Sequence, residues 1–413
     1  MSIFFKKKYK IYFFWLLLMM FLCGLYIYLD RANISSDNIL WQKTYGGDNE
    51  DVIKDLIIKN DNTFVGVGSS SSWGDPWQSI WLMKLDSQGN NISNIVEGEE
   101  NYNLANSVDL TEDGNLITAG ESNWLHCSSC NEKGKAWIAK INPDLQIIWE
   151  KYLGDDKNNS IEDILSVNTL GFAICGVAKY SNTSEFNAWF AFLDWEGNYF
   201  WNKEYNNLFQ DKATCILYLE KEGFLVAGHS QSRTLDKNDA WILKLTMDGN
   251  IEWEKHFVGN GINIISKIIP SINEGILAVG YTTSKGAGWQ DAWVIQLDKD
   301  GNVEWEKTFG GDEKDVMVSA IKVNNKYLLA GNTSSGSRSE GKLIMAWVIQ
   351  LDKDGNVEWE KTFGGDENIT TNGIICKDNK SIFLFGKIQV SEKEEYDGWI
   401  MNFRLQSENK SES

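Results

Sequence analysis

Apolar and polar residues alternate in short segments along most of the chain. Residues 293–298 (WVIQLD) and 303–309 (VEWEKTF) are two such segments, and Lys-Asp-Gly-Asn separates them. Period-two alternation is typical of a half-buried strand, and Asp-Gly supplies the positive φ angles of a tight hairpin turn. Residues 276–282 (ILAVGYT) and 316–323 (VMVSAIKV) have similar character. The pattern predicts a unit of four strands, which we call A (the 316–323 type), B (with the glycine), C and D.

This unit recurs seven times. Residues 292–313 and 346–367 are identical, and weaker copies fill the region between residues 39 and 404. Strand C of every unit has a tryptophan, at Trp81, Trp137, Trp189, Trp241, Trp293, Trp347 and Trp399. Strand D has a second one, twelve residues after the first where both occur, at Trp41, Trp149, Trp201, Trp253, Trp305 and Trp359, with Ser93 in the remaining unit. Strand B has a glycine in each copy, which indicates a bulge or a close backbone approach.

Seven four-stranded units of about 50 residues predict an all-β fold, a seven-bladed β-propeller of antiparallel strands. The chain order starts with a lone D strand at Trp41 and ends with strands A, B and C near residues 374–404. The N-terminal D strand can therefore complete the last blade and close the ring, which hides the sheet edges. An open solenoid is the alternative.

The segment LDKDGNVEW, residues 297–305, resembles the tryptophan-docking segment of quinoprotein-like propellers. The longer unit looks like repeats of bacterial and archaeal surface proteins that are predicted to be propellers. The resemblance covers residues 39–404 and implies that a turn glycine and the following Trp pack neighbouring blades. It also suggests a pyrroloquinoline-quinone dehydrogenase. Those enzymes are larger, usually eight-bladed, and have adjacent cysteines, whereas this chain has seven units and no Cys-Cys pair.

An apolar run precedes the repeats. Residues 11–28 are uncharged and follow four lysines within residues 1–10. As a helix they would span roughly 27 Å, about one bilayer core. We expect a single-pass signal anchor in the cell membrane, with residues 1–10 in the cytoplasm, a linker at 29–38, the propeller outside the cytoplasm, and a disordered tail at 405–413. A cleaved signal peptide is the alternative.

Composition narrows the range of functions. The chain has 413 residues, 42% of them hydrophobic, which excludes a mainly disordered protein. Its formal net charge is −19, and −22 without residues 1–30. We expect no nucleic-acid partner, because affinity for phosphates comes from clustered Lys and Arg. The acidic residues could attract cations, or they could simply form a solvated surface.

The connections D–A and B–C should share one face of the ring, and they carry most of the sequence variation. Function usually lies on variable loops held by a rigid scaffold. Ten residues after the D-strand position is a predicted polar ring at the channel mouth, formed by Asp51, Asn103, Asn159, Asp211, Asn263 and Asp315. It could bind Ca²⁺ through oxygen ligands, or each residue could form an Asx turn that leads into strand A. Four positions later, Asp55 and Asp163 could also face the channel.

Four tryptophans lie outside the repeat pattern in B–C connections, at Trp73, Trp77, Trp124 and Trp289. A loop Trp can stack on a sugar ring or anchor a partner protein, or it can pack on its own blade. The residue after the repeated glycine also varies and includes His229 and Tyr281, which we add to the candidate ligand-binding residues.

The longest loop contains His126, Cys127 and Cys130. In a non-cytoplasmic compartment the cysteine pair could form a disulfide; free thiols or a metal site are the alternatives. A zinc site needs about four ligands, and the chain has only three His, so we expect no metal site. Cys175, Cys215 and Cys376 lie in apolar strand segments and should pack in the core.

No catalytic motif is present: the sequence has no phosphate loop, no nucleophile elbow and no His-Glu zinc signature. We therefore expect a non-catalytic binding or scaffold module for a protein, a peptide or an envelope glycan, with no cofactor. Two alternatives stay open. One is a surface polysaccharide hydrolase or lyase that uses channel carboxylates, and the other is a scaffold for envelope assembly.

Overall fold

The computed structural model describes residues 38–74, 77–98, 102–122, 134–154, 157–180, 185–206, 210–231, 237–336, 343–390 and 395–405. These residues form 28 β-strands in six sheets and contain no α-helix. The apolar run at 11–28 and the residues beyond Leu405 lie outside the described residues. Within the described part of the chain, no helix is long and apolar enough to cross a membrane.

Five sheets have four antiparallel strands each, and the sixth has eight. The first two sheets along the chain are β2 (Asp51–Ile58), β3 (Phe64–Ser70), β4 (Ser79–Leu85) and β5 (Asn91–Glu97), then β6 (Asn103–Leu110), β7 (Leu116–Ser122), β8 (Lys135–Ile141) and β9 (Ile147–Leu153). The eight-stranded sheet comprises β10 (Lys157–Val167), β11 (Gly171–Tyr180), β12 (Phe186–Leu193), β13 (Tyr199–Tyr205), β14 (Gln210–Leu219), β15 (Gly223–Gln231), β16 (Asn238–Leu245) and β17 (Ile251–Phe257).

The remaining sheets complete the ring. Two of them are β18 (Asn263–Pro270), β19 (Ile276–Thr282), β20 (Asp291–Leu297) and β21 (Val303–Phe309), then β22 (Asp315–Val323), β23 (Lys326–Thr333), β24 (Met345–Leu351) and β25 (Val357–Phe363). The last joins both ends of the chain and comprises β26 (Ile369–Lys377), β27 (Ser381–Gln389), β28 (Tyr396–Arg404) and β1 (Ile39–Tyr45). Strand β1 pairs antiparallel with β28, and Trp41 faces Asn402, so the lone N-terminal D strand completes the C-terminal sheet as predicted.

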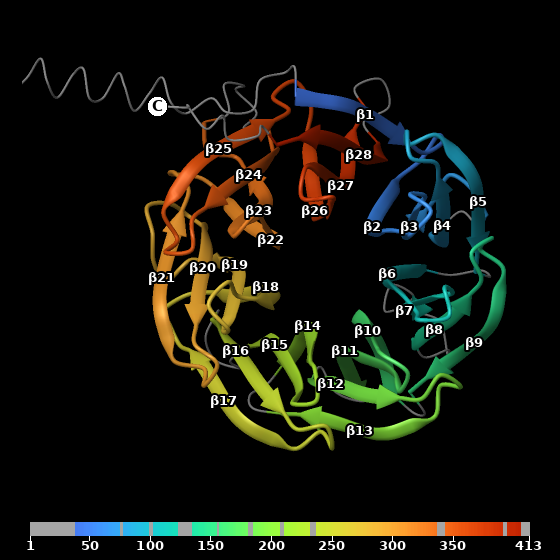
Figure 1. Cartoon of the computed structure of the whole chain (residues 1–413), viewed down its shortest axis with the longest axis horizontal. Helices are drawn as coiled ribbons and strands as arrows, with labels where there is room; N and C mark the ends of the chain where they lie inside the picture. The colour runs from blue at the N-terminus through green and yellow to red at the C-terminus, as the bar shows by residue number, and fades with distance from the viewer. Residues whose placement is uncertain are drawn as a thin grey trace, which may run out of the picture.

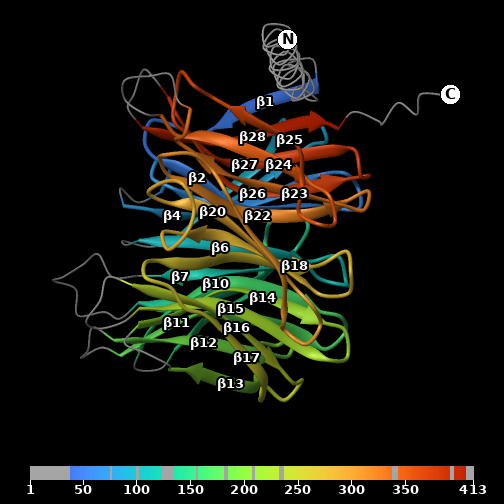
Figure 2. The same cartoon turned by 90° about the vertical axis from the view of Figure 1, so that its left-hand side faces the viewer.

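The sheets stand around a central axis like the blades of a β-propeller (Figure 1). The A strands β2, β6, β10, β14, β18, β22 and β26 are innermost, and the D strands form the circumference. In the side view the strands run roughly along the ring axis (Figure 2). The eight-stranded sheet consists of two four-stranded sets whose only link is one parallel pair, Phe186 with Gln210. Similar isolated bridges join other neighbouring sheets, for example Gln78 with Tyr102.

The repeated glycine of strand B is a close-approach site, as predicted. Every A strand has a register shift that begins two positions after the repeat position of Asp51, for example between Ile53 and Asp55 or between Ile161 and Asp163. The shift pushes a carbonyl toward strand B, and a Cβ at Gly68 would clash with the carbonyl oxygen of Val52. The same clash would occur at Gly120, Gly176, Gly228, Gly280, Gly331 and Gly386. Glycine is therefore required by the inner bulge of each sheet.

Tryptophans pack the sheets against one another. The C-strand indoles are buried, with exposed fractions of 0–5%. The D-strand indole lies on the turn of the next sheet, since a Cβ at Gly89 would be 2.6 Å from the ring of Trp41. The same packing occurs for Trp201 on Gly249, Trp253 on Gly301 and Trp305 on Gly355. This is the arrangement that the resemblance to tryptophan-docking repeats implies, although no family match supports that relationship.

The junction that follows β5 lacks both the indole and the glycine of this arrangement. The D strand β5 has Ser93 instead of Trp, and the turn of the next sheet has Leu145 in the glycine position. Leu145 adopts a φ of 66°, which is rare for a branched residue, and its side chain is fully buried in a core that includes Trp137. The leucine therefore occupies space that a docked indole fills at other junctions.

Candidate functional site

The B–C and D–A connections meet on one face of the ring, which we call the loop face. The backbone N–H of Asn103, at the start of β6, donates to the carbonyl of Gln78 over 2.9 Å, and that of Asp315 donates to Gln290 over 2.7 Å. In both pairs the acceptor precedes a C strand and the donor begins the A strand of the next sheet. The variable connections are thus held together by the scaffold.

Three of the four candidate loop tryptophans are described, and all three are exposed. The exposed fractions are 37% for Trp73, 56% for Trp77 and 75% for Trp289. The ring of Trp73 lies 5.7 Å from that of Trp81, and the ring of Trp77 lies 5.7 Å from that of Tyr102. Lys314 Nζ lies 5.5 Å from the centre of the Trp289 ring. Partial packing therefore coexists with substantial exposure.

The tryptophans do not converge on one site. Trp73 and Trp77 belong to the connection between β3 and β4, whereas Trp289 lies between β19 and β20. These sheets are on opposite sides of the ring (Figure 1). Trp124, together with His126, Cys127 and Cys130, lies outside the described residues. Trp73 and Trp77 are thus the only candidates that the described residues place in one loop.

A pocket of about 370 Å³ opens beside Trp73. It lies where the outer strand β1 approaches β5 and the connection before β4. Its lining consists of Lys43, Thr44, Tyr45, Gly46, Trp73, Trp81, Gly89, Asn90, Asn91 and Asn94. No sequence pattern indicated this pocket, because it forms between strands about 45 residues apart.

His229 and Tyr281 each follow a repeated glycine and pair with the innermost strand, His229 with Lys212 and Tyr281 with Ile264. Burial, and then the positive charge of Lys212, lower the pKa of His229 to about 4. Its Nδ1 is buried and has no hydrogen-bond partner among the described residues. Burial also raises the pKa of Tyr281. The imidazole of His229 is therefore neutral at pH 7.

Charged side chains gather near His229 on the inner strands. Lys212 Nζ lies 2.8 Å from Glu162 Oε1. Burial, and then the negative charge of Glu162, raise the pKa of Glu121 to about 7. Burial lowers the pKa of Lys54, and the positive charge of Lys387 adds to that effect. Perturbed pKa values of this kind are common at functional sites but also occur in structural networks.

The six residues of the predicted polar ring are buried, with exposed fractions of 0–4%. Most are hydrogen-bonded within their own sheet or loop. Asp51 accepts from the backbone N–H of Gly47 over 2.8 Å and from Ser72 Oγ over 2.6 Å. Ser122 Oγ donates to Asn103 over 2.6 Å, and Ser230 donates to Asp211. These contacts are the ones that the turn-forming alternative expects, whereas Asp51 Oδ1 and Asn159 Oδ1 are buried without a hydrogen-bond partner among the described residues.

Asp55 and Asp163, by contrast, come close to each other. Ser107 Oγ lies 3.1 Å from an oxygen of each carboxylate, and Lys267 Nζ lies 3.0 Å from Asp163 Oδ2. Burial raises the pKa of Asp55 to about 6. The four residues come from β2, β6, β10 and β18, so they lie around the interior of the ring. Sequence reasoning identified the shared repeat position, but the distances across the ring depend on closure.

Both carboxylates also connect neighbouring blades. The backbone N–H of Val108 donates to Asp55 over 3.0 Å, and that of Ile216 donates to Asp163 over 3.1 Å. Each donor lies on the inner strand that follows that of its acceptor. The carboxylate oxygens are therefore largely occupied by structural contacts.

The described residues contain no group of three or more His, Cys, Asp or Glu that could hold a metal ion. Cys175 and Cys215 are buried free thiols and Cys376 is half-buried, as expected for strand cysteines. The cysteine pair at 127 and 130 stays a prediction.

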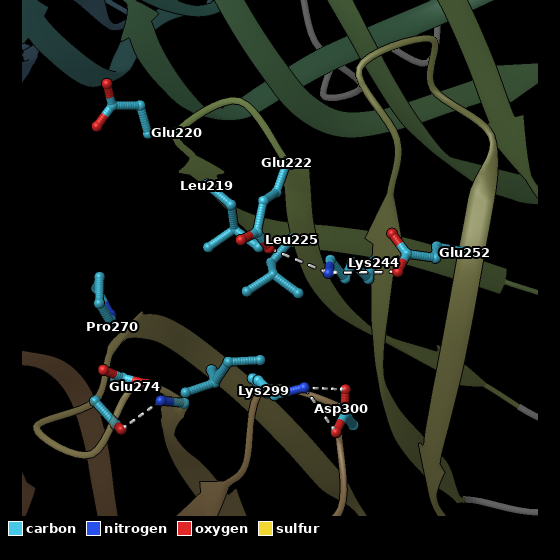
Figure 3. Close-up of a pocket in the computed structure, with 13 residues that line it drawn as sticks. Leu219, Glu220, Glu222, Leu225, Lys244, Glu252, Pro270, Glu274, Lys299 and Asp300 are labelled. Carbon is cyan, nitrogen blue, oxygen red and sulfur yellow. Dashed lines mark hydrogen bonds and ion pairs between the residues drawn. The ribbon is translucent and has the colours of Figure 1, made fainter.

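A second pocket, of about 580 Å³, lies on the opposite face between the turns of β14–β17 and those of β18–β21 (Figure 3). Its charged residues include Glu222 and Glu252, which flank Lys244 at 3.3 and 3.4 Å. Lys299 and Asp300 form another pair at 3.0 Å. The short uniform turns here are part of the repeat, so this pocket is a weaker candidate than the variable loop face.

No family model and no curated protein matches the chain. Solved structures do match, among them polysaccharide lyase Uly1, which is 8% identical with a TM-score of 0.53 over 91% of this chain and 95% of that one. A protein of unknown function from Dyadobacter fermentans is 11% identical with a TM-score of 0.52, over 89% and 99% of the two chains. A puromycin hydrolase is 9% identical with a TM-score of 0.52, over 86% of this chain and 56% of its own. At these identities the likeness shows the propeller-like fold alone.

Proposed function

We propose that the chain is a non-catalytic binding or scaffold module whose loop face receives a protein, a peptide or an envelope glycan. The observation that carries this proposal is the exposure of Trp77, Trp73 and Trp289 on loops that a regular frame supports. A loop indole contributes a large rigid contact area at a low cost in conformational entropy. The proposal counts seven blades by dividing the eight-stranded sheet at its single parallel link.

The proposal includes a membrane anchor at residues 11–28, with residues 1–10 in the cytoplasm. The circumference of the ring supports it. The residue before the D-strand Trp position is apolar and exposed in four consecutive blades, at Leu40, Ile92, Ile148 and Phe200. The other three blades have glutamate there, at Glu252, Glu304 and Glu358.

This asymmetry gives the ring a preferred side for a bilayer. Strand β1, which belongs to the apolar side, begins at Ile39, so ten residues (29–38) lie between it and residue 28. A linker of that length reaches at most ~35 Å. An anionic lipid surface repels the glutamate side more strongly, so the apolar side would face the membrane.

A polysaccharide hydrolase or lyase is the second candidate. The approach of Asp55 and Asp163 to the same Ser107 hydroxyl favours it, since a close pair of carboxylates can serve as acid and base. We rank it below binding because both carboxylates accept backbone hydrogen bonds from the next blade. A scaffold for envelope assembly would use the same loop face with a protein partner.

The test is a pull-down from solubilised membranes with the full chain. We compare the wild type with a variant in which Trp73, Trp77, Trp124 and Trp289 are all changed to Ala. The control is Ile251→Ala, which removes an exposed apolar residue from the glutamate side of the circumference. We expect the loop variant to lose its partner and the control to retain it. Full retention by the loop variant would show that the site assignment is wrong.

A further inference from the structure

The pocket beside Trp73 has an unusual lining for so acidic a protein. None of its ten lining residues is Asp or Glu, and its single charge is Lys43. Two other pockets formed by described residues include carboxylates, among them Glu220, Glu222 and Glu252 in one, and Asp291 and Glu360 in the other. A pocket with indole, hydroxyl and amide groups suits an uncharged or weakly acidic polar ligand.

The hydrogen bonding around this pocket departs from the repeat. Thirteen residues after the C-strand Trp, the D strand has a residue that accepts a hydrogen bond from the indole in three blades. The pairs are Trp137 with Glu150 at 2.9 Å, Trp189 with Asn202 at 2.6 Å and Trp293 with Glu306 at 2.6 Å. Asn94 is the corresponding residue for Trp81, but the two do not form this bond.

Two polar groups at this pocket therefore do not form the hydrogen bond that joins them in other blades. The indole Nε1 of Trp81 is buried and has no hydrogen-bond partner in the described part of the chain. Trp241 and Trp399 share that feature, so an unpaired indole alone does not mark a site. At Trp81 it coincides with a pocket, and Asn94, which is exposed, lines the same pocket. An exposed amide that is not used within the blade is available to a ligand.

Trp73 supplies an aromatic wall. About a third of its surface is exposed, and its ring rests against Trp81 at 5.7 Å between ring centres. The indole also approaches Gly47, where an added Cβ would lie 3.5 Å from Cε2. The ring is thus fixed by packing on one side and available on the other, as a stacking platform requires.

Lys43 is the only charged residue in the lining of this pocket. Its Nζ donates to the carbonyl of Gln88 over 2.8 Å and to the side-chain oxygen of Asn90 over 2.6 Å. Both acceptors are neutral. Asp86, outside the lining, accepts from Asn90 Nδ2 over 2.8 Å, and its negative charge acts on Lys43. The ammonium itself lines the pocket, so it disfavours a cationic ligand, such as a sugar with a free amine.

We propose that this pocket binds one hexopyranose residue of a glycan. The apolar C–H face of the sugar stacks on Trp73, and its hydroxyls bond to the amides of Asn91 and Asn94. The pocket volume, about 370 Å³, is at the lower end for small-molecule sites, which fits a sugar ring and not a folded segment of protein. The inference rests on the proposed function and selects the glycan from its possible ligands.

Fluorine NMR of the full chain, biosynthetically labelled with 5-fluorotryptophan, tests the site. Each indole gives its own ¹⁹F signal, and single Trp→Phe variants assign the signals of Trp73, Trp77 and Trp289. The probes are cellobiose, maltose, chitobiose and methyl glucuronide, with glucosamine as the cationic comparison. We expect at least one neutral or acidic sugar to shift the Trp73 signal in a saturable way and to leave Trp289 unchanged.

Two matched variants separate binding from structure. Asn94→Ala removes the available amide and should weaken sugar binding about fivefold, the effect of one hydrogen bond. Asn202→Ala changes the same repeat position in a blade without this pocket and should leave binding unchanged. If the two variants weaken binding equally, or if no sugar shifts the Trp73 signal, the glycan site is overturned.

The outcome is distinguishable from failure of the proposed function. A chain that still captures its membrane partner through the loop tryptophans, but shows no sugar-dependent change at Trp73, refutes the sugar site alone. Trp73→Phe keeps an aromatic platform and guards against misfolding of Trp73→Ala; in both variants binding is measured from the ¹⁹F signal of Trp81, which lines the same pocket and is assigned with Trp81→Phe. Retained binding in Trp73→Phe with loss in Trp73→Ala would support stacking.

Discussion

The junction between β5 and the turn before β9 offers a direct test of how the blades pack. Four junctions dock a D-strand indole on a turn glycine, and this one has Ser93 and Leu145 instead. If Leu145 replaces the missing indole, exchanging both residues should restore the common arrangement. We therefore predict that Ser93→Trp and Leu145→Gly are each destabilising and that the double variant is close to wild type.

The magnitudes follow from burial and backbone conformation. Leu145 is fully buried, and deleting such a side chain costs about 3–5 kcal/mol. Glycine relieves the cost of the left-handed conformation, about 1–2 kcal/mol, so Leu145→Gly should lose about 2–3 kcal/mol net. Adding an indole against Leu145 should cost about 1–3 kcal/mol by overpacking. The double variant should recover most of both losses, which gives a coupling free energy of about 2–4 kcal/mol.

Urea denaturation of the four proteins measures these free energies of unfolding. The reverse exchange, Trp253→Ser with Gly301→Leu, is the matched control, because a Cβ at Gly301 would lie 3.1 Å from the ring of Trp253. It should show coupling of the same sign. Additive losses in the Ser93 and Leu145 cycle would mean that the leucine does not occupy the space of an indole, and the explanation of this junction would be wrong.

Three other changes test the interior of the ring. Glu121→Gln should raise the free energy of unfolding at pH 8 by about 1–3 kcal/mol. The folded state raises the pKa of Glu121 to about 7, so it favours the protonated carboxyl and is destabilised as the pH rises and the carboxyl ionises. Denaturation at several pH values should show that the difference between variant and wild type vanishes below pH 4. Lys267→Met should cost about 3–5 kcal/mol because buried Asp163 loses its counter-charge, and adding Asp163→Asn should recover part of that loss in urea denaturation. Gly280→Ala should lower thermal stability by about 1–3 kcal/mol, since the methyl group would clash with the carbonyl oxygen of Ile264; unchanged melting would contradict the close approach.

The four-stranded sheets and their order could be predicted from the sequence, because the same pattern of residues recurs in each repeat. The glycine of strand B, the turn glycine and the two tryptophans recur at regular positions, and each has a packing role in the structure. The pairing of β1 with β28 followed from the order of strands alone. Repetition made these features predictable, since a strand that is ambiguous in one repeat can be assigned from the equivalent positions in the others.

The candidate sites were harder to predict because they are where the repeat breaks. The contact of Lys267 with Asp163 spans 104 residues and depends on the closed ring. The proposed site at Trp73 includes Asn94, which does not accept a hydrogen bond from the indole of Trp81. This feature stands out only in comparison with the blades in which the corresponding residue does accept that bond. The burial of Asp51 and its equivalents also could not be predicted from their shared repeat position, because it depends on how the loops cover them.

The central claim, that the loop face is the binding surface, can be measured by site-specific photo-crosslinking in cells that make the full chain. Benzoyl-phenylalanine at positions 77 and 289 reports the loop face, and at positions 113 and 300 it reports the opposite face, where the short turns lie. We expect discrete crosslinked products from position 77 or 289 and none from 113 and 300. Products from the turn face alone would contradict it.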